Sequence, residues 1–385
     1  MKKYIPEILT CVKVCGNDHT WCGHPVQAGE IFYFGNGEIA FMHLHADDVD
    51  YDDPKTNLGH GQTGIHGKCV VKLTRSYDGG YTWKEEDSSI VFGQAWPVEE
   101  QEKLINNIIT EENAQPLTED TIFHWDMCFC GPLMKDGVRR QMISFMRRSE
   151  DKGHTWSDSV MRPDNIGYTA LQHASGPVIR QEGRMLKPFG ASIIPDVDNV
   201  SPAAYRAVLY ASENDGVNWR YVSDIARDIT GEDSHSYCTV QDMGEGHLVA
   251  FTGSWRAVNA DTRWICCCHS YDNGLNWTLP KRIQSFGTAP YSVKLRDGRI
   301  LVLYCRRDPV KARGIFGMIS DDQGQTWSEE FAIRRGATTN DIGYPIAIET
   351  EDNHIFVGYY YVTEEFGIHA TGDGPMFIEG TLFII

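Results

Sequence analysis

The sequence predicts an all-β fold, a six-bladed β-propeller, and two independent repeats carry this prediction. An octapeptide recurs five times along the 385 residues, and six short turns between apolar strands alternate with it. Successive octapeptides begin about 50 to 75 residues apart, and such self-similarity is typical of architectures built from repeated small sheets. We expect residues 1–385 to form one domain.

The octapeptide has the pattern S-x-[DN]-x-G-x-[TN]-W, and the positions that its five copies share have physical roles. Its copies occupy residues 76–83, 149–156, 212–219, 270–277 and 320–327. The Asp or Asn side chain can accept bonds from backbone N–H groups of its own turn, and the glycine can adopt a positive φ. The tryptophan is expected to bury its ring between sheets. Each copy therefore predicts a turn between two strands with a built-in anchor.

A second set of turns predicts hairpins that join the first two strands of each blade. These turns occupy residues 33–38, 134–137, 180–184, 242–247, 296–299 and 349–354. An octapeptide follows each of the first five, which gives six blades. In the second blade the hairpin runs almost directly into its octapeptide.

The two ends of the chain are expected to share the sixth blade. Residues 377–385 end that blade without an octapeptide, and the alternating residues 8–14 can supply its outer strand. Closing a ring in this way hides sheet edges. Residues 97–113 do not fit the pattern, because their apolar residues have helical spacing after an acidic start. We expect one short inserted helix there.

Composition excludes several functional classes. The net charge of −18 repels nucleic acid and anionic membranes, so neither is an expected partner. Pro6 and Glu7 stand where a signal peptide needs an apolar run, which predicts a cytoplasmic protein. The 11 cysteines, with a run at 266–268, predict buried reduced thiols rather than disulfides. They lack paired CxxC spacing, so neither a metal nor another cofactor is expected. The oligomeric state is left open.

The octapeptides, the hairpins between them and the chain's ending resemble the sialidase (neuraminidase) superfamily, in which such repeats are called Asp boxes or BNR repeats. The resemblance covers nearly the whole chain and implies that the boxes are structural and lie away from the active face. It implies an action on carbohydrate, since these propellers include sialidases, other glycoside hydrolases, polysaccharide lyases and sugar-binding proteins.

Sialidases of this superfamily use three arginines to clamp the substrate carboxylate, a tyrosine nucleophile paired with a glutamate, and an aspartate acid/base. Arg256 matches the place of the second arginine and Tyr344 that of the tyrosine. His24, Ala289 and the 234–237 segment stand where the other two arginines and the glutamate are expected. The resemblance therefore favours a divergent sialidase, or an enzyme for another sugar, over an ordinary sialidase.

Topology predicts where a site lies. If the boxes occupy one face, the starts of first strands and the ends of second strands meet on the opposite face, around the axis. Loops at blade ends carry function more often than strands do. The residues predicted there for catalysis are Tyr344, Asp341, Asp126, Asp48 and His235. Those predicted for substrate binding are Arg256, Arg306, Arg307, His24, His124, His173, His45, Asp233 and Tyr237. Tyr361 ends a second strand as well, and strand alternation requires either Arg306 or Arg307 to point away.

Three functions remain open from the sequence. The first is an exo-acting glycoside hydrolase that removes a terminal acidic sugar, with Tyr344 as nucleophile, Asp341, Asp233 or a histidine as its base, and Asp126 or an aspartate of the 47–52 loop as acid. The second is a lyase on a uronate-containing glycan that uses His and Tyr as base and acid. The third is a sugar-binding propeller without catalysis, with Trp21, Trp125 and Trp255 on its rim.

Overall fold

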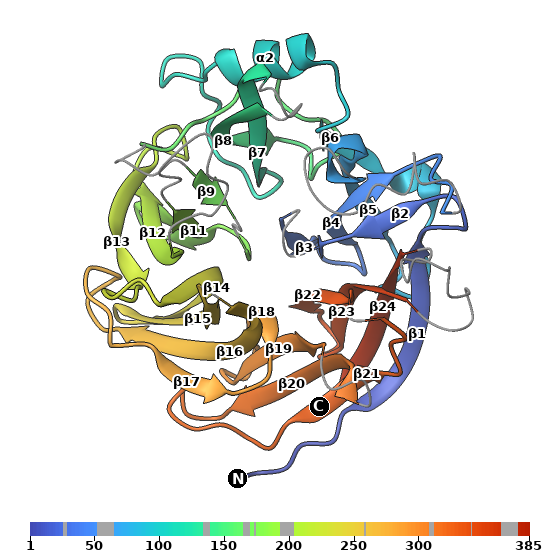
Figure 1. Ribbon diagram of the computed structural model, residues 1–385, viewed down its shortest axis with the longest axis vertical. Coiled ribbons are helices and arrows are strands. Elements are labelled where there is room, and N and C mark those ends of the chain that lie inside the picture. Colours follow the sequence, from blue (N-terminus) through green and yellow to red (C-terminus); the bar gives the residue numbers. More distant parts are fainter. Residues whose placement is uncertain are drawn as a thin grey trace.

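The computed structural model describes residues 1–25, 29–51, 65–133, 139–164, 170–172, 175–192, 204–257, 259–307, 312–339, 341–362 and 376–385. In these residues the chain is an all-β propeller with one α-helix, and its sheets are arranged around a common centre (Figure 1). Within the same residues, none of the helices has the length and apolar character that crossing a membrane requires.

Five sheets of four or five strands form the blades that the structure describes. Sheet 1 contains β2 (Trp21–Gly23), β3 (Ile31–Tyr33), β4 (Ile39–Ala46), β5 (Val70–Ser76) and β6 (Ser89–Gly93). Sheet 3 contains β9 (Ala170–Gln172), β10 (Ile179–Gln181), β11 (Arg184–Ser192), β12 (Arg206–Ser212) and β13 (Arg220–Ala226). Sheet 4 contains β14 (Asp233–Gly244), β15 (His247–Arg256), β16 (Asn259–Ser270) and β17 (Lys281–Gln284). Sheet 5 contains β18 (Thr288–Lys294), β19 (Ile300–Arg306), β20 (Gly314–Ser320) and β21 (Phe331–Arg335).

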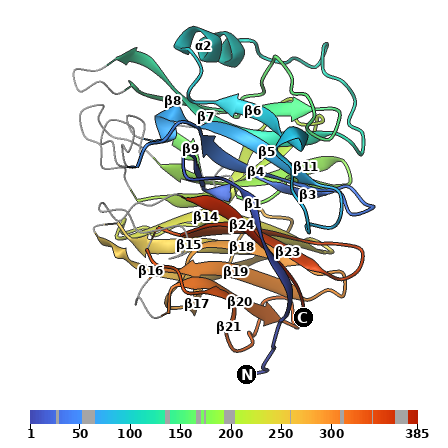
Figure 2. The same cartoon turned by 90° about the vertical axis from the view of Figure 1, so that its right-hand side faces the viewer.

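Sheet 6 unites the two ends of the chain. Its strands are β22 (Gly343–Glu349), β23 (Ile355–Tyr361), β24 (Phe377–Ile384) and β1 (Glu7–Cys15). β1 pairs antiparallel with β24, from Glu7 opposite Ile384 to Cys15 opposite Ile378, and Figure 2 shows the two strands side by side. The N-terminal segment is therefore the outer strand of the last sheet, as its alternation predicted.

Sheet 2 corrects the prediction of six complete blades. It consists of only β7 (Ile122–Leu133) and β8 (Arg139–Ser149), because the second octapeptide begins at the last residue of β8. Among the described residues that follow this octapeptide, Met161 and Val160 form isolated bridges with Met146 and Ile108 instead of adding a strand to sheet 2. The described residues thus form five blades and a two-stranded sheet, and the turn predicted at 134–137 lies outside them.

The octapeptides form the predicted turns. In the first, Ser76 Oγ accepts a bond from Gly80 N at 3.0 Å, and Asp78 Oδ1 accepts one from Thr82 N at 2.8 Å. The same two bonds recur in the other four copies. Each fifth-position glycine has a positive φ, between 82° and 96°, where a Cβ would be strained. Four of the five turns connect the last two strands of a blade, as predicted.

The box tryptophans anchor neighbouring sheets to one another. The ring of Trp83 lies 5.3 Å from Phe41 in sheet 1 and 5.1 Å from Phe356 in sheet 6. Trp219 of sheet 3 is fully buried and its ring lies 6.1 Å from Trp125 in sheet 2. Aromatic burial of this kind contributes strongly to packing. The repeated motif therefore supplies both the turn and the contact between sheets.

The inserted helix α2 (Val98–Asn106) lies on the periphery between sheets 1 and 2 (Figure 1). It is shorter than the predicted 97–113. Asn107 leaves helical geometry with ψ at 86°, and the following residues pair with residue 160: Ile109 N donates to Val160 O at 2.9 Å. The apolar spacing at 108–109 therefore reflects this pairing and not another helical turn. Single 3₁₀ turns occur at η1 (Ile65–Lys68) and η2 (Glu85–Asp87).

A buried ion pair links sheet 1 to sheet 3. Lys187 Nζ in β11 lies 2.5 Å from a carboxylate oxygen of Glu30, just before β3, and both side chains are at most 1% exposed. Lys187 also donates to the carbonyl oxygen of Gly176. Burial raises the pKa of Glu30, and Lys187 only partly offsets this effect. Charges this deeply buried need their partners, because an unpaired buried charge is strongly destabilising.

Candidate active site

Four aromatic rings from two sheets and the β2 end converge on one cluster, which we call the tyrosine cluster. It consists of His24 after β2, Tyr237 in β14, Tyr344 in β22 and Tyr360 in β23. The ring of Tyr344 lies 4.6 Å from that of His24, 5.4 Å from that of Tyr237 and 5.6 Å from that of Tyr360. All four side chains are at most 9% exposed. Three residues predicted at the starts of first strands, His24, Tyr237 and Tyr344, thus meet in this cluster, and Tyr360 joins them from a second strand.

Unusual backbone conformations direct these side chains. His24, Tyr237, Ala289 and Tyr344 all have φ between 47° and 52°, a left-handed region that costs a non-glycine residue roughly 1–2 kcal/mol. In β14, β18 and β22 this residue lies where the pairing with the next strand shifts register. Such bulges re-aim side chains near active sites, and strain of this kind concentrates at functional sites. The same left-handed backbone conformation therefore recurs in several blades around the cluster.

The hydroxyl groups of Tyr237 and Tyr344 lie 3.0 Å apart, so that one donates a hydrogen bond to the other. Burial, and to a smaller extent Tyr344, raises the pKa of Tyr237 well above its usual value. Arg263 and Arg307 act on this pKa in the opposite direction. Tyr237 therefore keeps its proton at neutral pH and lies within the electrostatic influence of two guanidinium groups.

Arg307 connects the cluster to Asp341. Its guanidinium donates to Tyr360 Oη at 2.9 Å and to the carbonyl oxygen of Ile342 at 3.2 Å, and it lies 5.4 Å from the centre of the Tyr344 ring. Tyr360 Oη donates to Asp341 Oδ1 at 2.6 Å, and the same oxygen lies 3.9 Å from Arg307 Nη2. These contacts hold Arg307 in place, so its positive charge lies beside the Tyr344 ring.

Arg306 points the other way, as strand alternation required of one of the two arginines. Its Nη1 lies 2.6 Å from Glu330 Oε1, and its guanidinium lies over the rings of Phe286 and Phe316. Tyr304 Oη donates to the other oxygen of Glu330 at 2.6 Å. Arg306 therefore belongs to a separate network in sheet 5.

Two side chains that sequence reasoning did not select complete the site. Tyr360 lies in the cluster instead of Tyr361, whose ring packs at 5.6 Å against Tyr359 and under Arg334. Tyr360 is paired opposite Gly343, and knowledge of that register would have identified it. Arg263 lies in the third strand β16, outside the positions considered. It donates to Thr288 Oγ1 at 3.3 Å and lies over the ring of Trp255.

Trp255 is the one of the three predicted rim tryptophans that is only partly buried. Its ring lies 5.7 Å from Tyr205 and 6.3 Å from Tyr237, whereas Trp21 and Trp125 are each only 3% exposed. An indole at the border of a polar site is suited to stack on a sugar ring. Trp21 and Trp125 are core residues, which corrects their predicted place on the rim.

Predicted residues near the start of β14 and at the end of β15 contact other side chains of this region. Arg256 Nη1 lies 3.1 Å from Asp233 Oδ1 and 3.0 Å from Glu232 Oε2. His235 Nδ1 lies 2.8 Å from Ser254 Oγ, and burial lowers the pKa of His235. The histidine is therefore neutral at pH 7, and Arg256 is already paired with two carboxylates.

The other predicted residues lie in sheets 1 and 2. His124 Nε2 lies 3.1 Å from Asp126 Oδ2, with His124 fully buried. His45 Nε2 lies 2.9 Å from Asp47 Oδ1, and Asp48 is exposed with φ at 56°. His173 lies outside the described residues. The structure thus brings together His24, Tyr237, Arg307, Asp341 and Tyr344. Other groups bind the predicted residues His45, His124, Asp126, Asp233, His235, Arg256 and Arg306, whereas Asp48 is exposed.

Comparison with known proteins relates the chain to repeat-containing propellers. A family model described as "BNR repeat-like domain" matches residues 66–362. Comparison with curated protein sequences found no match. Among solved structures, a protein of unknown function from Dyadobacter fermentans is 20% identical, with a TM-score of 0.71 and 99% of each chain covered.

Two enzymes of known activity are similar at lower identity. The NanB sialidase from Streptococcus pneumoniae is 11% identical, with a TM-score of 0.57, covering 98% of this chain and 70% of that one. The GH93 α-L-arabinofuranosidase of Fusarium graminearum, solved with arabinobiose, is 10% identical, with a TM-score of 0.59 and 97% of each chain covered. At these identities the likeness establishes a shared fold.

Proposed function

The chain belongs to the family of BNR repeat-like domains, and on this premise we propose that it is an exo-acting glycoside hydrolase. Its substrate is a glycan or oligosaccharide that ends in an acidic sugar, a sialic acid or a uronate. The observation that carries the proposal is the contact between the hydroxyls of Tyr237 and Tyr344, with Arg307 beside it.

The charges around this contact favour an anionic substrate. The protein as a whole carries a net charge of −18, but Arg263 and Arg307 both act on the hydroxyl of Tyr237. Guanidinium groups bind carboxylates with paired hydrogen bonds. We therefore assign the sugar carboxylate to the side of the cluster that faces these two arginines.

Tyr344 takes the role of nucleophile. A phenol, unlike a carboxylate, does not repel an anionic sugar while it approaches the anomeric carbon. In this role Tyr237 is the donor of the hydrogen bond between the two hydroxyls, which lie 3.0 Å apart, and Arg307 lies 5.4 Å from the Tyr344 ring. Both interactions stabilise negative charge on the Tyr344 oxygen as its proton passes to a base, a role that we give to His24, whose ring lies 4.6 Å from that of Tyr344. Asp341 orients Tyr360 and Arg307 and does not contact the nucleophile in this assignment.

The acid that protonates the leaving oxygen is assigned to Asp48. Asp47 is bound to His45 and Asp126 to His124, whereas Asp48 is exposed on the loop that follows β4. The assignment rests on the availability of this carboxylate.

A lyase acting on a uronate-containing glycan is the second candidate. The observation that favours it is the partner of Tyr344, which is another tyrosine where the sialidase pattern has a glutamate. Tyrosine can serve as base and acid in β-elimination, and an arginine can neutralise the carboxylate next to the proton that is removed. The two functions share the cluster and differ in their products.

The deciding experiment offers the purified protein a panel of fluorogenic sialosides, uronides and neutral glycosides, together with uronate oligosaccharides. Tyr344→Phe is the test variant and Arg306→Lys the matched control, because Arg306 pairs with Glu330 away from the cluster. Fluorophore release from a sialoside or uronide that only Tyr344→Phe loses supports the hydrolase.

Two other results would redirect the assignment. An unsaturated product that absorbs in the ultraviolet, formed without release of a saturated sugar, identifies the lyase. Saturable binding of an acidic sugar with neither product means that the propeller binds its ligand without catalysis.

A further inference from the structure

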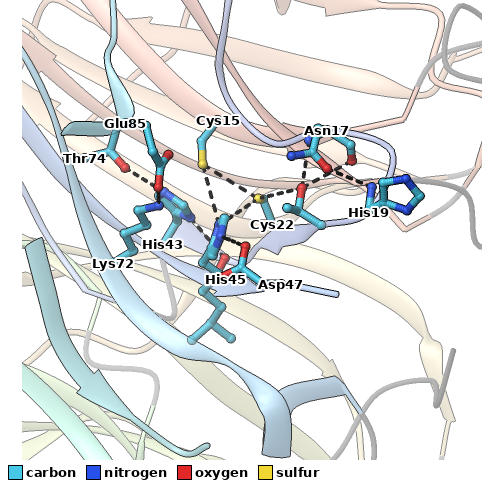
Figure 3. A network of polar contacts seen from close by, with 12 residues as sticks. Cys15, Asn17, His19, Cys22, His43, His45, Asp47, Lys72, Thr74 and Glu85 are labelled. Atoms are coloured by element: carbon cyan, nitrogen blue, oxygen red, sulfur yellow. Dashed lines mark hydrogen bonds and ion pairs between the residues drawn. The ribbon is translucent and has the colours of Figure 1, made fainter. Parts of the chain in front are cut away.

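Three potential metal ligands from two different sheets meet in the interior, apart from the residues of the tyrosine cluster (Figure 3). Cys15 ends β1 in sheet 6, Cys22 lies in β2 and His45 in β4 of sheet 1. Their exposed fractions are 7%, 0% and 4%. A thiol pair and an imidazole nitrogen are the ligands that zinc prefers in proteins.

The distances between the three atoms fit the edges of a tetrahedron around zinc. Zn–S bonds of about 2.3 Å and Zn–N bonds of about 2.0–2.1 Å give edges of roughly 3.8 Å between two sulfurs and roughly 3.6 Å between sulfur and nitrogen. Cys15 Sγ lies 3.9 Å from Cys22 Sγ and 3.6 Å from His45 Nδ1. Cys22 Sγ lies 3.2 Å from His45 Nδ1. Only the last edge must open by a few tenths of an ångström.

The imidazole is oriented as a ligand. His45 Nε2 lies 2.9 Å from Asp47 Oδ1, so this nitrogen carries the proton and Nδ1 presents its lone pair to the two sulfurs (Figure 3). A metal-bound histidine usually donates its other N–H to a carboxylate in this way, which fixes its orientation and raises its basicity. The neighbouring His43 is engaged at both nitrogens, by Leu44 O and Thr74 Oγ1, and is therefore not counted among the ligands.

We propose that Cys15, Cys22 and His45 form a zinc site that fastens the first sheet to the last. Two thiolates and a neutral imidazole would leave a divalent ion without net charge in this buried position. A solvent molecule would complete the four ligands. The ion would hold the end of β1 against β2 and β4 at the junction where Cys22 N also donates to Met376 O at 3.0 Å. This proposal is independent of the proposed enzymatic activity.

The direct test is the metal content of tag-free protein after incubation with zinc and gel filtration, with four variants measured in parallel. We expect about one zinc per chain in the wild type, and loss of this zinc in Cys15→Ser and Cys22→Ser. Cys267→Ser is the matched control, because Cys267 is also buried and its sulfur also contacts a histidine, His269 Nε2, at 3.6 Å. It should keep its zinc. Asp47→Asn should bind zinc 10 to 100 times more weakly.

Cobalt substitution and thermal unfolding supply readouts that do not depend on activity. Cobalt in the wild type should produce thiolate charge-transfer absorption in the near ultraviolet and intense visible bands, which Cys22→Ser lacks. A strong chelator should lower the Tm of the wild type and of Cys267→Ser. It should leave the Tm of Cys22→Ser unchanged, and circular dichroism verifies that each variant is folded.

Two results would overturn the proposal. One is a zinc content in the wild type that Cys15→Ser and Cys22→Ser do not change. The other is a Cys15–Cys22 disulfide, detected by mass spectrometry of protein kept under reducing buffer, because a disulfide brings the sulfurs to about 2.05 Å and removes both thiolates.

Discussion

The hydroxyl oxygens of Tyr237 and Tyr344 lie 3.0 Å apart, although the two residues belong to sheets 4 and 6. Both residues have left-handed backbone conformations, with φ at 49° and 47°. The contact thus depends on two separate bulges, and it positions one phenol against the other in a buried site. Its removal should affect reactivity more than folding.

Tyr237→Phe tests this contact. The variant keeps the ring and loses the hydroxyl, so Tyr344 loses the donor that stabilises its charged form. We expect kcat/KM on the preferred acidic substrate to fall roughly 10- to 100-fold, since a hydrogen bond to a charged group contributes about 1.5–3 kcal/mol. A Tm within a few degrees of the wild type should accompany this loss. Unchanged kinetics would remove Tyr237 from the proposed mechanism.

The two adjacent arginines offer a second comparison. Arg307→Lys loses the paired donors to Tyr360 and Ile342, because an ammonium group cannot reproduce the guanidinium fork. We expect at least a 10-fold rise in KM for an acidic substrate. Arg306→Lys can keep a contact with Glu330 and should behave as the wild type in steady-state kinetics. Equal effects of the two substitutions would contradict the assignment of Arg307 to the site.

The buried pair of Lys187 and Glu30 predicts a stability effect. Lys187→Met leaves a carboxylate that is 1% exposed without its cation, and we expect a loss of about 3–5 kcal/mol in the free energy of unfolding. The double variant Lys187→Met/Glu30→Gln should recover part of this loss. Urea unfolding of the wild type, Lys187→Met and the double variant measures both quantities, and a double variant less stable than Lys187→Met would show that the pair is not coupled in this way.

Glu30 also predicts a pH dependence. Burial raises its pKa in the folded state above the ordinary value of 4.5, so the folded protein binds this proton at a pH where the unfolded chain has released it. The stability that this group contributes is therefore fully present below about pH 4.5 and is lost as pH rises through the folded-state pKa. Relative to Glu30→Gln, the wild type should gain stability as pH falls from 7 towards 4.5. Unfolding curves at several pH values measure the difference, and a difference that does not vary with pH would count against it.

The fold was largely predictable because its signals are local. Each octapeptide contains its own turn, glycine and anchor, so the blade turns, the strand pairing of β1 with β24 and the membership of a family with BNR repeats followed from short segments. The two-stranded sheet 2 departs from the predicted six complete blades. The box that directly follows β8 leaves no room for a third strand before the turn. Helix α2 was extended too far because Ile108 and Ile109 fit both helical spacing and pairing with residue 160.

The candidate site was predictable in position but only partly in composition. The rule that first strands begin around the axis placed His24, Tyr237 and Tyr344 correctly in one cluster. It selected Tyr361 where the cluster contains Tyr360, because a bulge at Tyr344 shifts the register of the facing strand. Cys15, Cys22 and His45 gave no metal signature in the sequence, since strands of two sheets, and not a short loop, bring them together.

The pairing of β1 with β24 has a consequence for how the protein is made. Glu7 leaves the ribosome well before its partner Ile384, which follows it by 377 residues. At synthesis rates of about 5–20 residues per second, β1 waits roughly 20 to 75 seconds before the strand that pairs with it, β24, is made. During that interval the nascent chain exposes a strand edge that another polypeptide can occupy, so protection by a chaperone, or fast elongation between β1 and β24, would determine the yield of folded protein.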